Sequence, residues 1–416
     1  EDILLEQGQR HRRTNGGHAI SYFQSLSAAG FAATAIAFGP GRMGFGLFVP
    51  ELKATFSMST AAVGFVSSLG FVGFFLALLV AQALLERRGP EAPVLAGLAA
   101  ATAGAGIVAV APSTVILAIG VFLVASSAGF AWTPFNDAVH RKVREVDRPA
   151  ALSAISTGTS VGIVAAGLAA LGMVLFGLSW RFCWALCAAA SAIALVANWA
   201  ALRHVEKAPV DGPQKAWRDL LQVGAIPLFV VAFVYGTTSA IYLSFAADHL
   251  RASGGVAGFP VAAMPALVFI CYGIVGLTGL LTGRAEDALG LARLLRLLMA
   301  AGALSVVLVV ILPRSWAGLI PSAGLQGIHV MMTSAVLAFW SERLFPSIPS
   351  LGFTAALLAT AGGSVLGPAI AGIVSDSYAA APMFLGTAAL PAATAVLLRD
   401  RHVRERSAVA AEVHRT

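Results

Sequence analysis

Twelve long apolar stretches divide the sequence, and they restrict the possible folds more than any other feature. A helix needs about 20 residues to cross a bilayer, and every stretch is about that long or longer. We predict spans at residues 22–50, 59–85, 92–111, 114–138, 150–178, 181–203, 220–247, 255–282, 290–312, 316–341, 348–374 and 380–399. Charged residues make up 11% of the chain, against about 25% in a soluble domain. The sequence therefore predicts an all-α membrane protein of twelve transmembrane helices, with lipid as its main solvent.

The basic residues between the apolar stretches indicate how the chain is oriented. If both termini lie in the cytoplasm, 22 of the 27 lysines and arginines are cytoplasmic and four are on the other side. Those four are Lys53, Arg181, Arg251 and Arg314. Cytoplasmic loops carry such an excess, so we predict a bacterial inner-membrane protein with both termini in the cytoplasm and no signal peptide. The loops also account for the net charge of +7, so no nucleic-acid partner is expected.

The two halves of the chain repeat each other. A charged, proline-bearing segment at 204–219 separates residues 1–203 from residues 220–416. Glycines within the predicted spans recur 205 residues apart. They are Gly158, Gly162 and Gly167 in the first half and Gly363, Gly367 and Gly372 in the second. Acidic residues recur as well. Glu51 corresponds to Asp248 at an offset of 197 residues, and Asp137 corresponds to Glu342 at an offset of 205. Duplicated bundles are a known transporter plan, so we predict two six-helix pseudo-repeats.

Two loops carry related motifs. Residues 283–290 read Gly-x-x-x-Asp-x-x-Gly, and residues 82–89 are a degenerate copy with Glu86 in place of the aspartate, followed by Arg87 and Gly89. The pair resembles the loops after helices 2 and 8 of the major facilitator superfamily. In that superfamily helix 4 often contains an arginine, and Val121 stands about where it would be. The resemblance covers the whole chain and implies the major facilitator fold and transport of a small solute.

The first apolar stretch contains Gly39-Pro40-Gly41-Arg42, with Phe45 and Pro50 further on. This pattern resembles helix 1 of a bacterial branch of YbfB-like permeases. It is also similar to helix 1 of organic anion and phosphate transporters, whose arginine binds the substrate anion. The resemblance implies that role for Arg42.

Arg42 is also unusual on physical grounds. It lies eight residues before Pro50, roughly 12 Å at about 1.5 Å per residue, and so near the bilayer midplane. A charge there costs at least about 2.5–3.5 kcal/mol on insertion scales, so it should face a wet cavity or a partner. A guanidinium that binds a carboxylate or phosphate is one interpretation. An arginine hydrogen-bonded to carbonyls at the Gly-Pro-Gly break is the other.

Four further residues are candidate substrate contacts. Tyr235 and Tyr242 are seven residues apart and share a face of helix 7, and Gln326 and His329 share a face of helix 10. Their polar groups need partners within the membrane, and histidine can also carry a proton near neutral pH. The alternative for His329 is a neutral ring hydrogen-bonded between helices.

Charged residues at the cytoplasmic helix ends form a predicted latch. Glu86, Arg87 and Asp137 would join helices 2 and 4, and Asp287 and Glu342 would be their counterparts in the second half. Such contacts can break and form as two halves rock. Ordinary interfacial charge is the alternative.

We therefore predict a secondary active transporter with alternating access, in which Arg42 binds a small organic anion among helices 1, 4, 7 and 10. Proton coupling stays open, because no mid-membrane carboxylate is visible. An efflux pump for drugs or amphiphilic metabolites is the alternative among transporters, and a transporter-like sensor or assembly protein is the alternative of another functional class. We expect no enzyme activity, cofactor or metal site, and a monomer whose partners are its substrate, lipid and, with coupling, protons.

Overall fold

The computed structural model describes residues 22–203, 205, 220, 223–346 and 348–403. Within these residues, twelve helical segments are long and apolar enough to cross a membrane. The predicted linker at 204–219 lies outside the described residues except for Val205. The number of spans predicted from the sequence is confirmed.

The first six spans begin with a broken helix. Span 1 consists of α2 (Tyr22–Ile36), a π-helical segment η1 (Ala37–Met43) and α3 (Gly44–Phe56). The others are α4 (Thr60–Arg88), α5 (Glu91–Val110), α6 (Thr114–Ser126) continued by α7 (Trp132–Lys142), α8 (Arg148–Phe176) and α9 (Trp180–Leu202).

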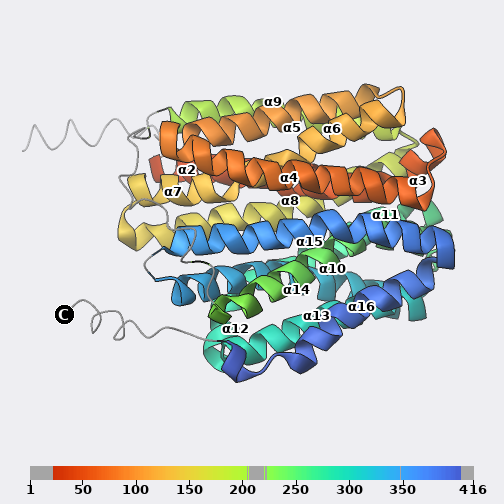
Figure 1. Ribbon diagram of the computed structural model, residues 1–416. Helices are drawn as coiled ribbons and strands as arrows, with labels where there is room; N and C mark the ends of the chain where they lie inside the picture. The colour runs from red at the N-terminus through yellow and green to blue at the C-terminus, as the bar shows by residue number, and fades with distance from the viewer. Residues whose placement is uncertain (1–21, 204, 206–219, 221–222, 347, 404–416) are drawn as a thin grey trace, which may run out of the picture.

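The second six spans follow the same order. They are α10 (Ile226–Ala252), α11 (Met264–Gly276) continued by α12 (Thr282–Leu289), α13 (Leu291–Ile311), α14 (Trp316–Leu344), α15 (Pro349–Tyr378) and α16 (Ala380–Leu397). Figure 1 shows α2 to α9 in the upper part of the bundle and α10, α12, α13, α14 and α16 in the lower part, with α11 and α15 along the boundary. We call the end where α2 begins and α16 finishes the tail end, and the opposite end the far end.

Two predicted boundaries shift for local reasons. Span 1 does not stop at Pro50 but continues to Phe56, and Ser57 with φ of 51° closes the helix. Span 8 begins at Val261, not at residue 255. Gly254, Gly255 and Gly258 have positive φ, a conformation that glycine adopts readily and that helices exclude. These residues therefore form a turn before the span.

Helix crossings within each half confirm the repeat. A Cβ atom on Gly39 would overlap the carbonyl oxygen of Gly162 on α8, and one on Gly236 would overlap that of Thr360 on α15. Gly39 and Gly236 are 197 residues apart. Span 1 therefore meets span 5 as span 7 meets span 11, with small residues that let the backbones approach closely.

Crossings between the halves follow the same symmetry. Gly167 on α8 packs against Ile270 of α11, and Gly372, its counterpart 205 residues later, packs against Thr60 and Ala61 of α4. Gly46 on α3 contacts the backbone of Leu243 on α10. These two positions are themselves 197 residues apart, so their contact lies on the pseudo-two-fold axis that relates the halves.

Adjacent glycines on α15 provide a test of this packing. A Cβ atom at Gly363 would overlap the carbonyl oxygen of Phe233, whereas one at Gly362 would meet nothing within 4 Å. Overpacking costs about 1–3 kcal/mol, so Gly363→Ala should lower the melting temperature of a 416-residue chain by roughly 1–4 °C. Gly362→Ala should leave it unchanged or raise it, because alanine favours helices. Melting curves of the purified variants measure this, and equal losses in both would contradict the crossing geometry.

Candidate functional site

Arg42 lies in the π-helical segment η1, in the middle of span 1. Pro40 inside this segment has no N–H to donate, which disturbs the regular helix. Short π-helical turns inside α-helices often occur at functional sites. All other described side chains that carry a charge at neutral pH are near the ends of their helices or in the connecting segments. Arg42 is therefore an isolated charge halfway through the bundle.

The Arg42 guanidinium is held by aromatic rings and not by acceptors. Its central carbon lies 5.0 Å from the centre of the Phe74 ring and 5.9 Å from that of Phe71, both on α4. Cations within about 6 Å of a ring centre are attracted by its face. Nε and Nη2 are buried, and among the described residues neither has a hydrogen-bond partner. In this conformation the carbonyls at the Gly-Pro-Gly break do not satisfy them.

Arg42 lines a small cavity between the two halves, with about 20 Å³ of free space. Its walls come from η1 and α3 (Gly41, Arg42, Phe45 and Gly46), α4 (Ser67, Gly70 and Phe71), α6 (Val121 and Ala125) and α10 (Leu243 and Ser244). A hydrogen bond of 2.5 Å joins the hydroxyls of Ser67 and Ser244 across the two halves. Spans 1, 4 and 7 contribute as predicted, but span 2 lines this cavity and span 10 does not.

The predicted tyrosines point into the second half. The Tyr235 hydroxyl donates to the carbonyl oxygen of Val330 at 3.2 Å, and the Tyr242 hydroxyl lies 3.0 Å from that of Ser322, both on α14. Neither tyrosine lines the cavity around Arg42. At the repeat position of Arg42, the hydroxyl of Ser239 donates to the Tyr235 carbonyl at 2.6 Å. The site is asymmetric.

His329 and Gln326 are fully buried inside the second half. His329 Nδ1 lies 2.8 Å from the carbonyl oxygen of Leu298 on α13, and the ring packs edge-on to Tyr235 at 5.5 Å. This contact matches the second interpretation of His329, a ring hydrogen-bonded between helices. The His329 Nε2 atom and both amide atoms of Gln326 have no partner among the described residues. Neither residue lines the cavity around Arg42.

Ion pairs join the two halves at the far end. Lys53 on α3 lies 2.8 Å from Asp248 on α10, and Arg251 on α10 pairs with Glu51 on α3. Because Glu51 and Asp248 are repeat counterparts, each acidic residue binds a base of the opposite half. All four side chains are partly exposed, at 17–29%.

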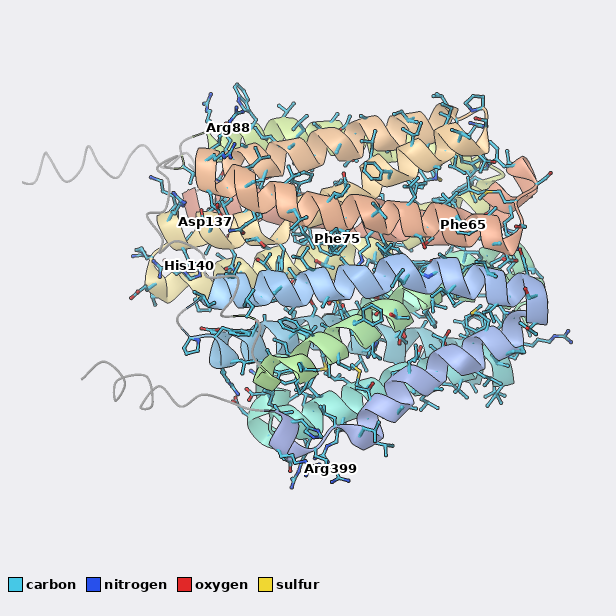
Figure 2. The ribbon with its side chains drawn as sticks, viewed as in Figure 1. Phe65, Phe75, Arg88, Asp137, His140 and Arg399 are labelled. Carbon is cyan, nitrogen blue, oxygen red and sulfur yellow. The ribbon has the colours of Figure 1, made fainter. Side chains whose placement is uncertain are left out.

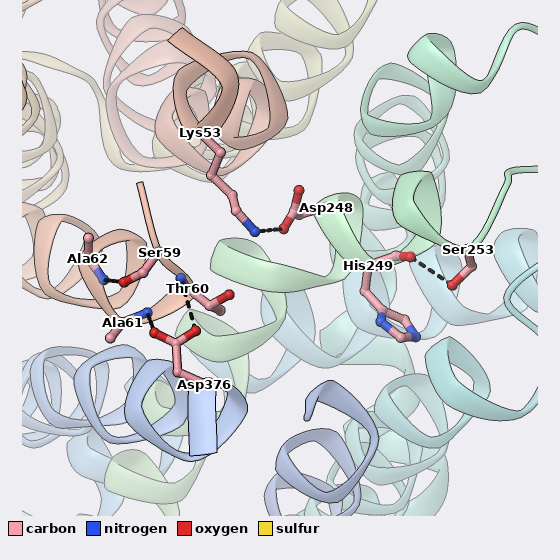
Figure 3. Close-up of polar contacts among 9 residues, drawn as sticks. All are labelled: Lys53, Ser59, Thr60, Ala61, Ala62, Asp248, His249, Ser253 and Asp376. Carbon is pink, nitrogen blue, oxygen red and sulfur yellow. Dashed lines mark hydrogen bonds and ion pairs between the residues drawn. The ribbon is translucent and has the colours of Figure 1, made fainter. Parts of the chain in front are cut away.

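Asp376 on α15 adds a third contact between the halves. Its carboxylate accepts hydrogen bonds from the backbone N–H groups of Thr60, at 3.1 Å, and Ala61, at 2.8 Å. These are the first residues of α4, whose free N–H groups and helix dipole favour a negative charge. Figure 3 shows this cap beside the Lys53–Asp248 pair. We call Glu51, Lys53, Asp248, Arg251 and Asp376 the far-end clasp.

Charged residues also form pairs at the tail end, where the latch between Glu86, Arg87 and Asp137 stays a prediction. Asp137 pairs with Arg141 on its own helix, Glu86 accepts a hydrogen bond from Gln82, and Arg87 is exposed. In the second half Asp287 and Glu342 are exposed, and the ion pair joins their neighbours Glu286 and Arg343. The Asp137–Arg141 and Glu286–Arg343 pairs each lie within one half. Figure 2 shows Arg88, His140 and Arg399 at this end.

The sequence reasoning missed most partners of these groups. Phe71 and Phe74 stand on α4 three residues apart, a spacing that places both on one face, but nothing in the sequence links that face to Arg42. Part of the far-end clasp was visible in the sequence, because Glu51 and Asp248 occupy equivalent positions in the two repeats. Lys53 and Arg251 were counted among the four basic residues of this side, but not as partners of the acids.

Comparisons with known proteins agree with this geometry. The family model of the Major Facilitator Superfamily matches residues 30–245. No curated protein matches the chain. A variant of the nucleoside transporter NupG superposes with a TM-score of 0.70 at 14% identity, covering 91% of this chain and 99% of that one. A bacterial homologue of the human lysosomal transporter Spinster, inward-facing and occupied, gives 0.69 at 16% identity, with 93% and 98% covered.

Proposed function

Since this chain belongs to the Major Facilitator Superfamily, we propose that it is a secondary transporter that carries a small organic anion on Arg42. The family and the twelve apolar helices make it a multi-pass membrane protein with a transporter fold. The observation that supports an anion is the pair of buried Arg42 donors, Nε and Nη2, which have no acceptor among the described residues. A buried donor left unpaired costs about 1–3 kcal/mol, and a carboxylate accepts two such donors at once.

The far-end clasp supports alternating access to this site. It joins the halves at the far end through two ion pairs and the hydrogen bonds of Asp376. The substrate would reach Arg42 from the tail end in this conformation. Transport then requires the clasp to open and the tail end to close, as one half rocks against the other.

The cavity favours an anion over the amphiphilic cations of many efflux pumps. No acidic residue is among those that line it. In proton coupling, the proton would travel on the acid group of the substrate, because His329 does not line the cavity.

A binding panel followed by transport tests the function. The purified chain is melted with carboxylates, phosphates and amphiphilic cations, and the anions that raise the melting temperature are then followed into proteoliposomes. Stabilisation and saturable uptake of an anion support the proposal. Stabilisation by cations alone would favour the efflux alternative.

Orientation has a separate test. We propose that the tail end is cytoplasmic, because 13 of the basic residues in the described chain lie there, and the four at the far end are paired or hydrogen-bonded. A single cysteine at Ser113, on the far end, should react with an impermeant thiol reagent added to whole cells. One at Val146, exposed at the tail end, should react only after permeabilisation. The reverse pattern would invert the topology.

A further inference from the structure

The cavity around Arg42 contains a single formal charge. Arg42 is the only ionisable residue among the side chains that line it. The hydroxyls of Ser67 and Ser244 are already bonded to each other, and Ser244 also donates to the carbonyl oxygen of Ala240 at 2.7 Å. One negative charge on a ligand would therefore be balanced, and a second would find no cation in the wall.

The rest of the cavity wall is apolar. Phe45 and Leu243 come from the two pseudo-symmetric helices, and Phe71, Val121 and Ala125 complete the surface. The free space in this conformation is about 20 Å³, which is room for about one water molecule, so a ligand binds here only when the surrounding helices move apart. Such walls stabilise a compact hydrocarbon or aromatic group, and they give no hydrogen bonds to a polyhydroxylated one.

We propose that this site selects monocarboxylates with a small apolar or aromatic body, and that it discriminates against dicarboxylates and phosphate monoesters. The inference rests on the proposed function and narrows its substrate class. Its physical basis is that a buried charge without a partner is strongly unfavourable. A dianion on Arg42 would carry one such charge into a wall of phenylalanine, valine and leucine side chains.

Val121 offers a way to reverse the preference. It lines the same cavity as Arg42, from α6, and it is 2% exposed. Val121→Lys would place a second cation beside the ligand. Val121→Met is the matched control for side-chain length without charge. Val110→Lys adds the same charge at an exposed far-end position of α5, outside the cavity.

The experiment compares four probes that share one ring: benzoate, phthalate, phenyl phosphate and neutral benzyl alcohol. Dissociation constants are measured by melting-temperature shift and by calorimetry on the detergent-purified chain, at a pH where both acid groups are ionised. We expect benzoate to bind at least about tenfold more tightly than either dianion, and Arg42→Ala to lose this binding. In Val121→Lys the dianions should gain at least about tenfold relative to benzoate, with no such gain in Val121→Met or Val110→Lys.

The outcomes separate the two proposals. If dianions bind the wild-type chain as tightly as benzoate and need Arg42, the anion site stands and the selectivity is wrong. If no anion shows binding that depends on Arg42, both fail. If Val121→Lys does not fold, the ranking of the probes on the wild-type chain still decides the selectivity.

Discussion

Replacing Arg42 with alanine should abolish anion binding while leaving the bundle folded. Nε and Nη2 are donors that a carboxylate can accept together, and each charge-assisted hydrogen bond contributes about 1.5–3 kcal/mol. The loss of two bonds should weaken binding by at least roughly 100-fold. Arg42→Lys keeps the charge but loses the planar guanidinium, so its affinity for the anion should lie between those of the wild-type chain and Arg42→Ala.

Stability should change little in Arg42→Ala. Nε and Nη2 of the guanidinium make no hydrogen bond to the described part of the chain, and removing a lone charge from the membrane interior relieves a cost. The contacts with Phe71 and Phe74 are the stabilising interactions that would be lost.

Arg181 is the matched control for an arginine with a structural role. Its Nη1 and Nη2 donate to the carbonyl oxygens of Ala109, at 3.0 Å, and Ala111, at 2.8 Å, at the end of α5. Arg181→Ala leaves those carbonyls unpaired, so it should lower the melting temperature and keep the affinity. Melting curves and anion titrations of both variants measure the contrast. A stable Arg42→Ala protein with wild-type affinity for the anion would contradict the proposed anion site.

Neutralising the two ion-paired acids of the far-end clasp, Glu51 and Asp248, should open that end of the bundle. In Glu51→Gln combined with Asp248→Asn, neither ion pair can form, and the pairs are too exposed to be worth as much as buried ones. We assign about 1–2 kcal/mol to their sum, which is a factor of roughly 5–30 in the population of the two conformations. Transport should slow, because the conformation with the far end closed is no longer favoured.

Spin labels can measure this opening directly. Val115 and Ile311 are exposed at the far end in opposite halves, and Val146 and Val396 are exposed at the tail end. With Cys183, Cys187 and Cys271 replaced, electron–electron distances between labels at each pair report the two ends. In the double variant the far-end distance should lengthen and the tail-end distance shorten.

A charge swap is the control for the clasp. Glu51→Arg alone should place like charges together, and adding Arg251→Glu should restore the wild-type distances. Failure of the swap to restore them, together with unchanged distances in the neutralised variant, would show that the clasp does not hold the far end.

The sequence alone determined the membrane architecture. Twelve spans follow from run lengths, because a bilayer admits a helix only when about 20 consecutive residues are apolar. The repeat was visible because close helix crossings admit only small residues, so Gly39 and Gly236, like Gly158 and Gly363, were retained at equivalent places. Arg42 was visible because a charge so far from any helix end has no ordinary explanation.

Only the tertiary structure decided which way the polar side chains face. Tyr235, Tyr242 and His329 were predicted to contact substrate, yet their hydrogen bonds are to α13 and α14 inside the second half. Lipid and the protein interior are equally apolar, so the apolar pattern does not fix how a buried helix is rotated about its axis. The rotation comes from packing against neighbouring helices.

The clasp partners also depended on the tertiary structure. Lys53 and Asp248 are 195 residues apart, and Asp376 is 315 residues from Ala61. Charge counting placed the basic members on one side of the membrane, but it carried no information about which pairs meet. That depends on the docking of α3 on α10 and of α4 on α15, where Gly46, Gly64 and Gly372 let the backbones touch.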